Sequence, residues 1–435
     1  MDTTVDLILP NGIRYQQPIG LFINNEFVKS KSGKTFETID PSNEEKIVDV
    51  YEADEADVDI AVKAARAAFE GEWSQYPAEK RGMIMQEFVR LIEEVRPTLA
   101  GVEAWDSGKP YTKAFSGDVS ELVGTFRYYA GWADKVFGRT IETHKNKLAY
   151  TMHQPIGVFV IKTAELTPLS ALFLGPLIEK AGFPPGVINI VSGLGKTAGA
   201  SLASHPDVDK IAFTSSTATG RTIMKLASVN LKAITLECGG KSPLIVCADA
   251  DIDKAVKAGH SGIMFNAGQV CTATSPIFVH ESVYDRYVAG FKDRIKEASK
   301  VGHPFEKTTS QGPQVSKTQR ERVLGFIEQG KKAGAKVAAG GNPTDSSAFM
   351  KEEIFGPVAS IARFADYDEA VRRANDTSYG LAAAVFTQNI TRGHRIAEKL
   401  QVGMVWINSN QDSHYGIPFG GWKTSGIGRE LGEYG

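Results

Sequence analysis

The stretch IGVFVIKTAELTPLSALFLGPLIEKAGFPPGVINIV, residues 156–191, alternates between strand and helix patterns. Its first apolar run, 156–161, predicts one buried parallel strand that ends in a charged loop with Lys162 and Glu165. A helix over 169–181 and a strand over 186–191 follow, and the same pattern continues with a helix at 201–205 and a strand at 210–214. This repetition predicts an α/β fold with a doubly wound parallel sheet, in which ligands bind at the carboxyl ends of the strands.

The segments on both sides of this stretch extend the pattern. Before it, residues 21–28 predict a strand pair that turns at Asn24 and Asn25, and amphipathic helices are expected at about 58–69, 77–95 and 116–133. After it, a second α/β unit is expected, with strands at 277–280, 359–364 and 382–386 and helices at 283–298, 319–333 and 369–375. Residues 147–154 alternate in the manner of an exposed edge strand.

The length and composition of the chain exclude several classes of protein. The 435 residues suffice for two or three domains with a large core. A net charge of −2 without a basic stripe argues against a nucleic-acid partner. Three cysteines are an odd number and too few for a disulfide framework, and the eight scattered histidines have no metal-ligand spacing.

The chain also lacks the marks of export or membrane insertion. Asp2 and Asp6 stand where a signal peptide would need basic residues. No stretch approaches the roughly 18 apolar residues that are needed to cross a bilayer. We therefore expect a soluble cytoplasmic protein without a membrane partner, and the cysteine content suits a reducing compartment.

The candidate nucleophile is Cys271, in the stretch NAGQVCTATS over residues 266–275. A thiol is a useful nucleophile as thiolate, and Gly268 with the small residues that follow the cysteine lets the backbone pack close to the sulfur. A single cysteine is otherwise most often a small buried hydrophobic residue. Glu237 favours the catalytic interpretation, because it ends the strand-like run 233–237 before Gly239 and is placed to act as a base toward a neighbouring loop.

The motifs TLECGGKSP at 235–243 and FNAGQVCTATS at 265–275 resemble those of the NAD(P)-dependent aldehyde dehydrogenase superfamily. EEIFGPV at 352–358 and PFGGWKTSGIGRELGEY at 418–434 agree with the family in the same order. The resemblance implies that Cys271 adds to an aldehyde, that hydride passes to NAD, and that Glu237 activates the water that hydrolyses the thioester. It also implies a homo-oligomer joined in part by the strand near 147–154.

The cofactor residues come partly from their position and partly from the resemblance. Lys162 and Glu165 follow a strand, where a carboxylate can accept a hydrogen bond from the adenosine 2′-hydroxyl, and the carboxylate of Glu165 would repel a 2′-phosphate. NAD is therefore expected rather than NADP. The resemblance places the pyrophosphate at the turn FTSSTATG, residues 213–220. Its cofactor positions are Ser215 (where the family usually has glycine), Ser216, Thr217, Ala218, Thr219, Gly220 and Cys238.

Three further positions are carried over from the resemblance. Glu353 and Phe355 match residues that hold the nicotinamide ribose and ring, although core packing explains Phe355 equally well. Phe419 matches an aromatic near the aldehyde pocket. The glycines of SGIGRELG, 425–432, are expected to support a tight turn into a helix, and GLGKT at 193–197 lacks the first glycine of a P-loop and is expected to be a turn into a helix.

The sequence departs from the family at several places. Between Val158 and Lys162 about thirty residues, roughly one βα unit, are missing, and with them the asparagine that holds the oxyanion. A second gap lies between Gly341 and Lys351, and the chain stops at Gly435 without the usual tail strand. The expected domains are a NAD-binding domain at 20–138 and 157–238, an oligomerisation segment at 139–156 and a catalytic domain at 239–431.

Several functions stay open at this point. The chain is expected to be an active aldehyde dehydrogenase, a catalytically impaired relative that serves as a binding or scaffold protein, or the product of a shortened gene model. A cysteine hydrolase that uses Cys271 and Glu237 without a cofactor is a further alternative. Formation of NADH from aldehydes, with a Cys271→Ala control, separates the first two.

Overall fold

The first lobe contains two separate sheets. In the computed structural model, which describes residues 2–334 and 348–434, the first sheet has the order β4–β3–β10–β9. It comprises β3 (Leu21–Ile23), β4 (Glu26–Val28), β9 (Val160–Lys162) and β10 (Asn189–Val191), with β9 parallel to β10. Asn24 and Asn25 both have positive φ, as a two-residue hairpin turn requires, and the predicted strand pair is confirmed.

The second sheet of this lobe has the order β11–β12–β18. β11 (Lys210–Thr214) and β12 (Ala233–Glu237) are parallel, and β18 (Gly426–Ile427) pairs with β12 in the antiparallel sense. The helices of this lobe are α1 (Glu55–Glu70), α2 (Glu72–Gln75), α3 (Ala78–Glu94), α4 (Arg96–Ser107), α5 (Tyr111–Lys113), α6 (Val119–Trp132), α7 (Leu169–Phe173), α8 (Gly175–Ala181), α9 (Ala200–Ser204) and α10 (Thr217–Ala227). Short strand pairs precede α1: β1 (Thr4–Ile8) with β2 (Arg14–Pro18), and β5 (Thr35–Ile39) with β6 (Lys46–Tyr51).

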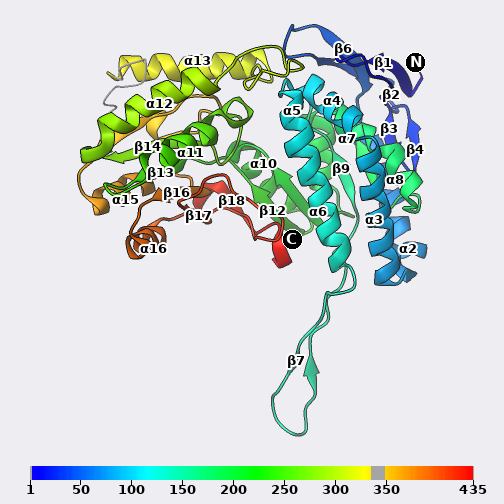
Figure 1. The fold of residues 1–435 in the computed structure, drawn as a ribbon. Helices are drawn as coiled ribbons and strands as arrows, with labels where there is room; N and C mark the ends of the chain where they lie inside the picture. The colour runs from blue at the N-terminus through cyan, green and yellow to red at the C-terminus, as the bar shows by residue number, and fades with distance from the viewer. Residues whose placement is uncertain (1, 335–347, 435) are drawn as a thin grey trace.

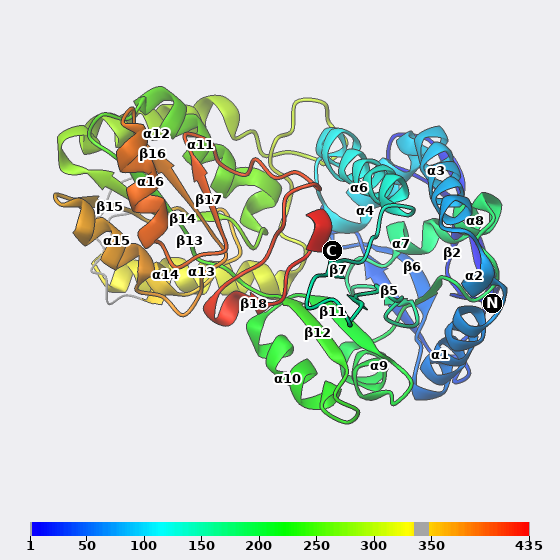
Figure 2. The ribbon, with the colours of Figure 1, turned by 90° about the horizontal axis from the view of Figure 1, so that it is seen from below.

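The second lobe is built on one parallel sheet in the order β15–β14–β13–β16–β17. Its strands are β13 (Ser242–Val246), β14 (Thr274–His280), β15 (Ile361–Phe364), β16 (Ala382–Phe386) and β17 (Met404–Ile407). The helices are α11 (Ile252–Met264), α12 (Tyr284–Ala298), α13 (Lys317–Lys332), α14 (Ala348–Lys351), α15 (Tyr367–Asn375) and α16 (Ile390–Lys399). Seen from below, the two lobes lie side by side with the C-terminal segment between them (Figure 2).

A hairpin of β7 (Thr140–Ile141) and β8 (Ala149–Tyr150) extends away from the first lobe (Figure 1). It is shorter than the strand expected over 147–154. Several of its apolar side chains are exposed: Val136, Phe137, Ile141, Leu148, Tyr150 and Met152. An arm with this composition is typical of a surface that another chain covers.

Two expectations about local structure were wrong. The run 156–161 does not form one buried strand, because only Val160–Lys162 pairs, and Ile156 and Phe159 are 59% and 55% exposed. The segment SGIGRELG does not turn into a helix of any length, since it forms β18 against β12 and then a single 3-10 turn at Gly432–Tyr434. Of the gap between Gly341 and Lys351, the part before residue 348 lies outside the described residues.

The elements whose sequence pattern was unambiguous agree with the structure. β11, β12 and β16 have the predicted bounds, and the expected helices match α1, α3, α6, α12, α13 and α15 to within a few residues. The N-terminus of α1 illustrates why: Asp54 caps the helix and accepts from the Ala56 N–H at 2.9 Å, and Asp57 completes a capping box. Val58, Ala61 and Val62 then line one buried face.

Candidate active site

The Cys271 loop lies at the amino ends of β13 and β14, directly beyond the carboxyl end of β12. The chain passes from β12 to β13 within four residues, so the end of one sheet faces the start of the other. Gly268 has a φ of +73°, and a Cβ there would overlap the backbone of Gly356. Gln411 holds the loop from the other side, since its side-chain amide donates to the Thr272 carbonyl at 2.6 Å.

Glu237 is the last residue of β12 and carries the carboxylate nearest this crossing. Its side chain is only 3% exposed, and neither carboxylate oxygen has a hydrogen-bond partner among the described residues. A Cβ on Gly420 would lie 3.0 Å from its Oε1, so the segment after Phe419 covers it. Burial, followed by the charge of Glu430, raises the pKa of Glu237 to about 8 against the opposing effect of Arg429. Such a group is poised to exchange a proton near neutral pH.

The pKa of the Cys271 thiol is raised, whereas an activated nucleophile would have a lowered pKa. Burial, followed by the charges of Glu353 and Glu237, raises the pKa of Cys271 to about 12. The backbone N–H groups of Cys271 and Thr272 lower it. In the surroundings that the chain alone provides, the sulfur is therefore protonated at neutral pH.

Glu353 approaches the same crossing from the loop before β15. Its Oε1 accepts from the Gly240 N–H at 3.0 Å, and a Cβ on Gly239 would overlap the carboxylate, so this close approach requires glycine. Lys241 is 5% exposed beside Glu353, and burial lowers its pKa to about 7. Phe355, two residues further on, has a φ of +58° and its carbonyl accepts from Gln319 at 2.7 Å.

Phe419 lies on the last segment of the chain. Its backbone bridges to Glu430, with N–H···O distances of 2.7 and 2.8 Å in the two directions. The bridge holds the segment that covers Glu237, which agrees with a position near the reacting groups. Cys271, Glu237, Glu353 and Phe419 thus come to one region from four separate parts of the sequence.

Lys162 and Glu165 lie at the carboxyl end of β9, as expected. The Gly195 N–H donates to the Glu165 carboxylate, and the Lys162 ammonium donates to the Thr163 carbonyl at 2.9 Å. Burial lowers the pKa of Lys162, and Glu165 partly opposes that effect. Both side chains therefore lie beside the segment Gly195–Gly199. This segment is a π-helical turn that leads into α9, in agreement with the predicted turn into a helix.

The turn before α10 has the geometry of an anion site. Ser216 is the N-cap, and its hydroxyl accepts from the Thr219 N–H at 3.2 Å. The N–H groups of Thr217 and Ala218 have no partner inside the helix and lie at its positive end. Ser215, Ser216, Ala218 and Thr219 are exposed, whereas Gly220 is buried.

Cys238 lies beneath this turn and is buried in the core. A Cβ on Gly220 would come within 2.8 Å of its sulfur, so glycine is needed for α10 to pack this closely on β12. The Cys238 thiol therefore supports the helix and does not face the exposed turn. Its backbone N–H donates to the Ser425 carbonyl at 2.8 Å.

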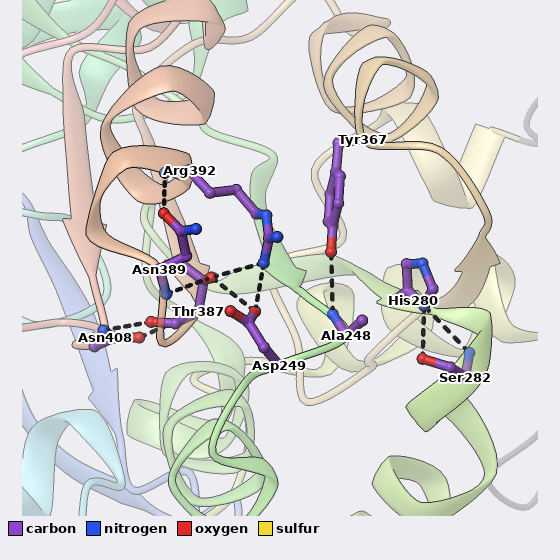
Figure 3. Close-up of polar contacts among 9 residues, drawn as sticks. All are labelled: Ala248, Asp249, His280, Ser282, Tyr367, Thr387, Asn389, Arg392 and Asn408. Atoms are coloured by element: carbon purple, nitrogen blue, oxygen red, sulfur yellow. Dashed lines mark hydrogen bonds and ion pairs between the residues drawn. The ribbon is translucent and has the colours of Figure 1, made fainter.

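The carboxyl edge of the five-stranded sheet is a second place where a ligand would be expected, because the strand order reverses between β13 and β16. Asp249, after β13, pairs with Arg392 at 2.7 Å and accepts from the Thr387 hydroxyl at 2.8 Å (Figure 3). Asn408, after β17, donates to the Thr387 carbonyl at 2.9 Å (Figure 3). These groups bond to one another across the strand ends, so the carboxyl edge is occupied by the protein's own side chains. Cys271 lies at the opposite, amino end of this sheet.

Sequence reasoning missed three residues of the site. Glu430 raises the pKa of Glu237, but its segment was expected to be a helical turn. Lys241 lies in the TLECGGKSP motif, directly before an apolar run, and this position was a signal that the lysine is buried. Gln411 holds the cysteine loop from a segment without any local signal, because only the folded chain brings residues 272 and 411 together.

Comparison with known proteins gives matches over the whole chain. The family model described as the aldehyde dehydrogenase family matches residues 27–161 and 158–435. An aldehyde dehydrogenase of Emericella nidulans is 50% identical over 466 residues, which cover 97% of this chain and 93% of the relative. The NAD+ complex structure of an aldehyde dehydrogenase from Bacillus cereus is 45% identical, with a TM-score of 0.92 and coverage of 96% of this chain and 94% of that one.

One alignment also bears on the expected deletion. An Aspergillus niger aldehyde dehydrogenase is 47% identical over 477 residues that cover 100% of this chain and 96% of the relative. Since the chain has only 435 residues, the alignment includes positions at which the relative has residues and this chain has none. The two family-model segments meet at residues 158–161, where the missing βα unit is expected.

Proposed function

The chain belongs to the aldehyde dehydrogenase family and is an NAD(P)-dependent oxidoreductase, and from this premise we propose that it oxidises an aldehyde to the carboxylic acid through a thioester on Cys271. The observation that carries the assignment of residues is the buried carboxylate of Glu237. It has no hydrogen-bond partner within residues 2–334 and 348–434, and it lies close enough to the sulfur to raise the pKa of Cys271. A carboxylate buried without a partner is costly to the fold, and a catalytic role explains its presence.

In the first half of the reaction, the carboxylate form of Glu237 takes the thiol proton of Cys271 as the sulfur attacks the carbonyl carbon of the aldehyde. Glu237 then releases this proton to the solvent. The carbonyl oxygen becomes an oxyanion, which the backbone N–H groups of Cys271 and Thr272 are near enough to stabilise. When bound, NAD+ supplies the acceptor for the hydride that leaves the same carbon, together with a positive charge at the site.

In the second half, Glu237 takes a proton from the water that attacks the thioester carbon. The bond between carbon and sulfur breaks, the acid departs, and the Cys271 sulfur takes the proton that Glu237 removed from the water. With a pKa of about 8, most of the Glu237 carboxyl is protonated at neutral pH, so a rise in pH increases the carboxylate form that this step requires.

The residues present fit a dinucleotide. The unpaired N–H groups at the start of α10 suit its pyrophosphate, and the close packing that Gly220 permits brings this helix near β12. Lys162 and Glu165 suit the adenosine ribose, and Glu353 with Phe355 would hold the nicotinamide end. We propose NAD rather than NADP, because the carboxylate of Glu165 would repel a 2′-phosphate.

The test is formation of NADH from a panel of aldehydes by the whole chain and by Cys271→Ala, with NAD binding by both proteins measured separately. We expect turnover by the whole chain and none by the variant, with similar NAD binding. Binding of NAD without turnover by the whole chain would favour the scaffold alternative. Hydrolysis of an activated ester in the complete absence of NAD, without aldehyde oxidation, would instead favour a cysteine hydrolase.

We also propose a homo-oligomer whose subunits are joined through the β7–β8 arm, because the apolar side chains of the arm are exposed in the single chain. The domains proposed are 20–138 with 157–238 for NAD, 139–156 for assembly and 239–431 for catalysis. Sedimentation of the whole chain and of a variant lacking 139–152 tests the assembly. A monomeric whole chain would contradict it.

A cytoplasmic location is proposed from the three free cysteines, which suit a reducing compartment. Over residues 2–334 and 348–434, no helix is both long and apolar enough to span a bilayer. Fractionation of cells followed by detection of the chain tests the location, and recovery in a secreted fraction would contradict it.

A further inference from the structure

The two lobes contain related sheets, of which one is incomplete. The sheet of the second lobe has the spatial order β15–β14–β13–β16–β17. If its strands are numbered by their order in the chain, with β13 as the first, this arrangement is third, second, first, fourth, fifth. In the first lobe, β10 and β9 lie in one sheet and β11 and β12 in another, and Val160 of β9 and Phe213 of β11 pack against the same core cluster. When this lobe is matched to the second, β10 and β9 take the third and second places, and β11 and β12 the fourth and fifth. The first place, between β9 and β11, holds no strand among the described residues. A first strand would precede β9 in the chain, which is where the junction 156–159 lies.

The backbone groups that face this gap can be identified from the observed ladders. The Thr163 N–H donates to Val191 of β10, and neighbouring residues of a strand face opposite sides, so the N–H groups of Val160 and Lys162 point away from β10. By the same reasoning, the Ser215 N–H donates to Glu237 of β12. Residues 210, 212 and 214 of β11 therefore present their N–H and C=O groups to the gap.

The burial of these strands agrees with two open edges. Ala212 and Thr214 of β11 are exposed, and all of β9 is only partly buried. In the second lobe, the strands in the same places, β14 and β16, are buried at every residue except His280 at the end of β14. Inner strands of parallel sheets are normally covered on both faces and paired on both edges.

An apolar cavity adjoins the junction. It has a volume of about 260 Å³ and is lined by side chains that include Phe69, Trp73, Met85, Phe126, Val158 and Phe183. These residues come from α1, α2, α3, α6 and the segments beside β9 and β10. Together with the exposed Ile156 and Phe159, they leave apolar surface where a crossover helix between a first strand and β9 would pack.

We propose that the gap between β9 and β11 is an acceptor for one extended apolar strand supplied in trans. Its occupant is a peptide of strand-and-helix character, whose strand pairs with both open edges and whose helix enters the apolar cavity. The strand should be apolar on both faces, since it would lie at the centre of a parallel sheet. Two observations agree with a missing strand at this place: the family match is divided at residues 158–161, and the alignment with the Aspergillus niger relative contains residues that this chain lacks.

The experiment uses the whole chain and a fluorescein-labelled synthetic peptide that contains a strand of apolar β-branched residues followed by an apolar helix. Binding is followed by fluorescence anisotropy, with a scrambled peptide as control. Ala212→Pro and Val160→Pro each remove one N–H from an open edge and leave the established ladders intact, whereas Ala212→Val keeps the N–H. Circular dichroism verifies that each variant is folded.

We expect saturable binding, weakened at least about tenfold by either proline and by scrambling, and nearly unchanged in Ala212→Val. Hydrogen exchange of residues 160–162 and 210–214 in the unaltered chain should slow when the peptide is added, which tests the site without any variant. No binding to the folded chain, equal binding of the scrambled peptide, or unchanged exchange at both edges would overturn the proposal. So would self-association of the chain that Ala212→Pro abolishes, because a second copy would then be the occupant.

The proposal uses the family assignment but not the chemistry of Cys271 and Glu237. Peptide binding is measured without NAD or aldehyde, and Cys271→Ala should bind the peptide as the unaltered chain does. A failure of aldehyde oxidation with intact peptide binding would therefore count against the proposed mechanism alone. A failure of peptide binding with intact oxidation would count against the acceptor alone.

Discussion

Glu237→Gln should make the protein more stable at alkaline pH while it removes aldehyde oxidation. The carboxyl of Glu237 has an ordinary pKa of 4.5, and burial raises it to about 8. Between these values the folded chain holds a proton that the unfolded chain has released, so the folded state loses stability as pH rises through this window. At about 1.4 kcal/mol for each pH unit, the loss is about 5 kcal/mol above pH 8.

The glutamine variant does not titrate and therefore does not lose this stability. At pH 5 the carboxyl is neutral in the folded chain, and the variant should unfold close to the unaltered protein. At pH 9 it should be more stable by several kcal/mol. With an unfolding entropy of about 2.1 cal/mol/K per residue, 5 kcal/mol corresponds to about 5 °C in Tm for a chain of this length.

The assay is thermal unfolding of both proteins at half-unit steps from pH 5 to pH 9, followed by circular dichroism. The difference in Tm between the variant and the unaltered protein is the quantity of interest, because other titrating groups affect both proteins equally. A difference that stays constant over this range would refute a Glu237 carboxyl that is buried without a partner. A variant that becomes the less stable protein at pH 9 would show that the charged form is stabilised instead.

Three further predictions concern Cys271, Glu430 and Glu165. Alkylation of Cys271 by iodoacetamide, in the protein without cofactor, should accelerate about tenfold per pH unit from pH 7 to 10, because its pKa is raised to about 12; a plateau below pH 9, measured by mass spectrometry, would contradict this. Glu430→Gln should lower the pKa of Glu237 and move the alkaline loss of stability to lower pH, and an unmoved midpoint in the same unfolding series would count against the proposed coupling. Glu165→Ala should reduce the preference for NAD over NADP at least about tenfold in kcat/KM, whereas an unchanged ratio would remove Glu165 from the site.

The sequence predicted those parts of the fold that depend on neighbours in the chain. β11 and β12 were predicted with the observed bounds, because each is a short run rich in apolar residues with turn residues at its ends. The position of Glu237 at the end of a strand followed from the same pattern. The resemblance in four separated motifs then pointed to the family, which the comparisons confirmed.

Local pattern failed where a segment found its partner far along the chain. An apolar run at 156–161 predicts burial, yet Ile156 and Phe159 are exposed because no strand lies beside them to cover them. Gly426 and Ile427 form a strand only because β12, almost 190 residues earlier, offers an open edge. Neither the exposure of 156–159 nor the pairing of 426–427 could be predicted from the residues of the segment itself.

The sequence by itself thus determined which residues carry reactive groups, the order of strands and helices, and the family to which the chain belongs. Only the tertiary structure decided the protonation of those groups, because a pKa depends on burial and on charges such as Glu353 and Glu430 that come from distant segments. It also decided that β9 and β11 each have one edge with no neighbouring strand among the described residues. Strand pairing depends on two segments that meet only in the folded chain. The backbone groups of β9 and β11 that face the gap therefore become visible only in the tertiary structure.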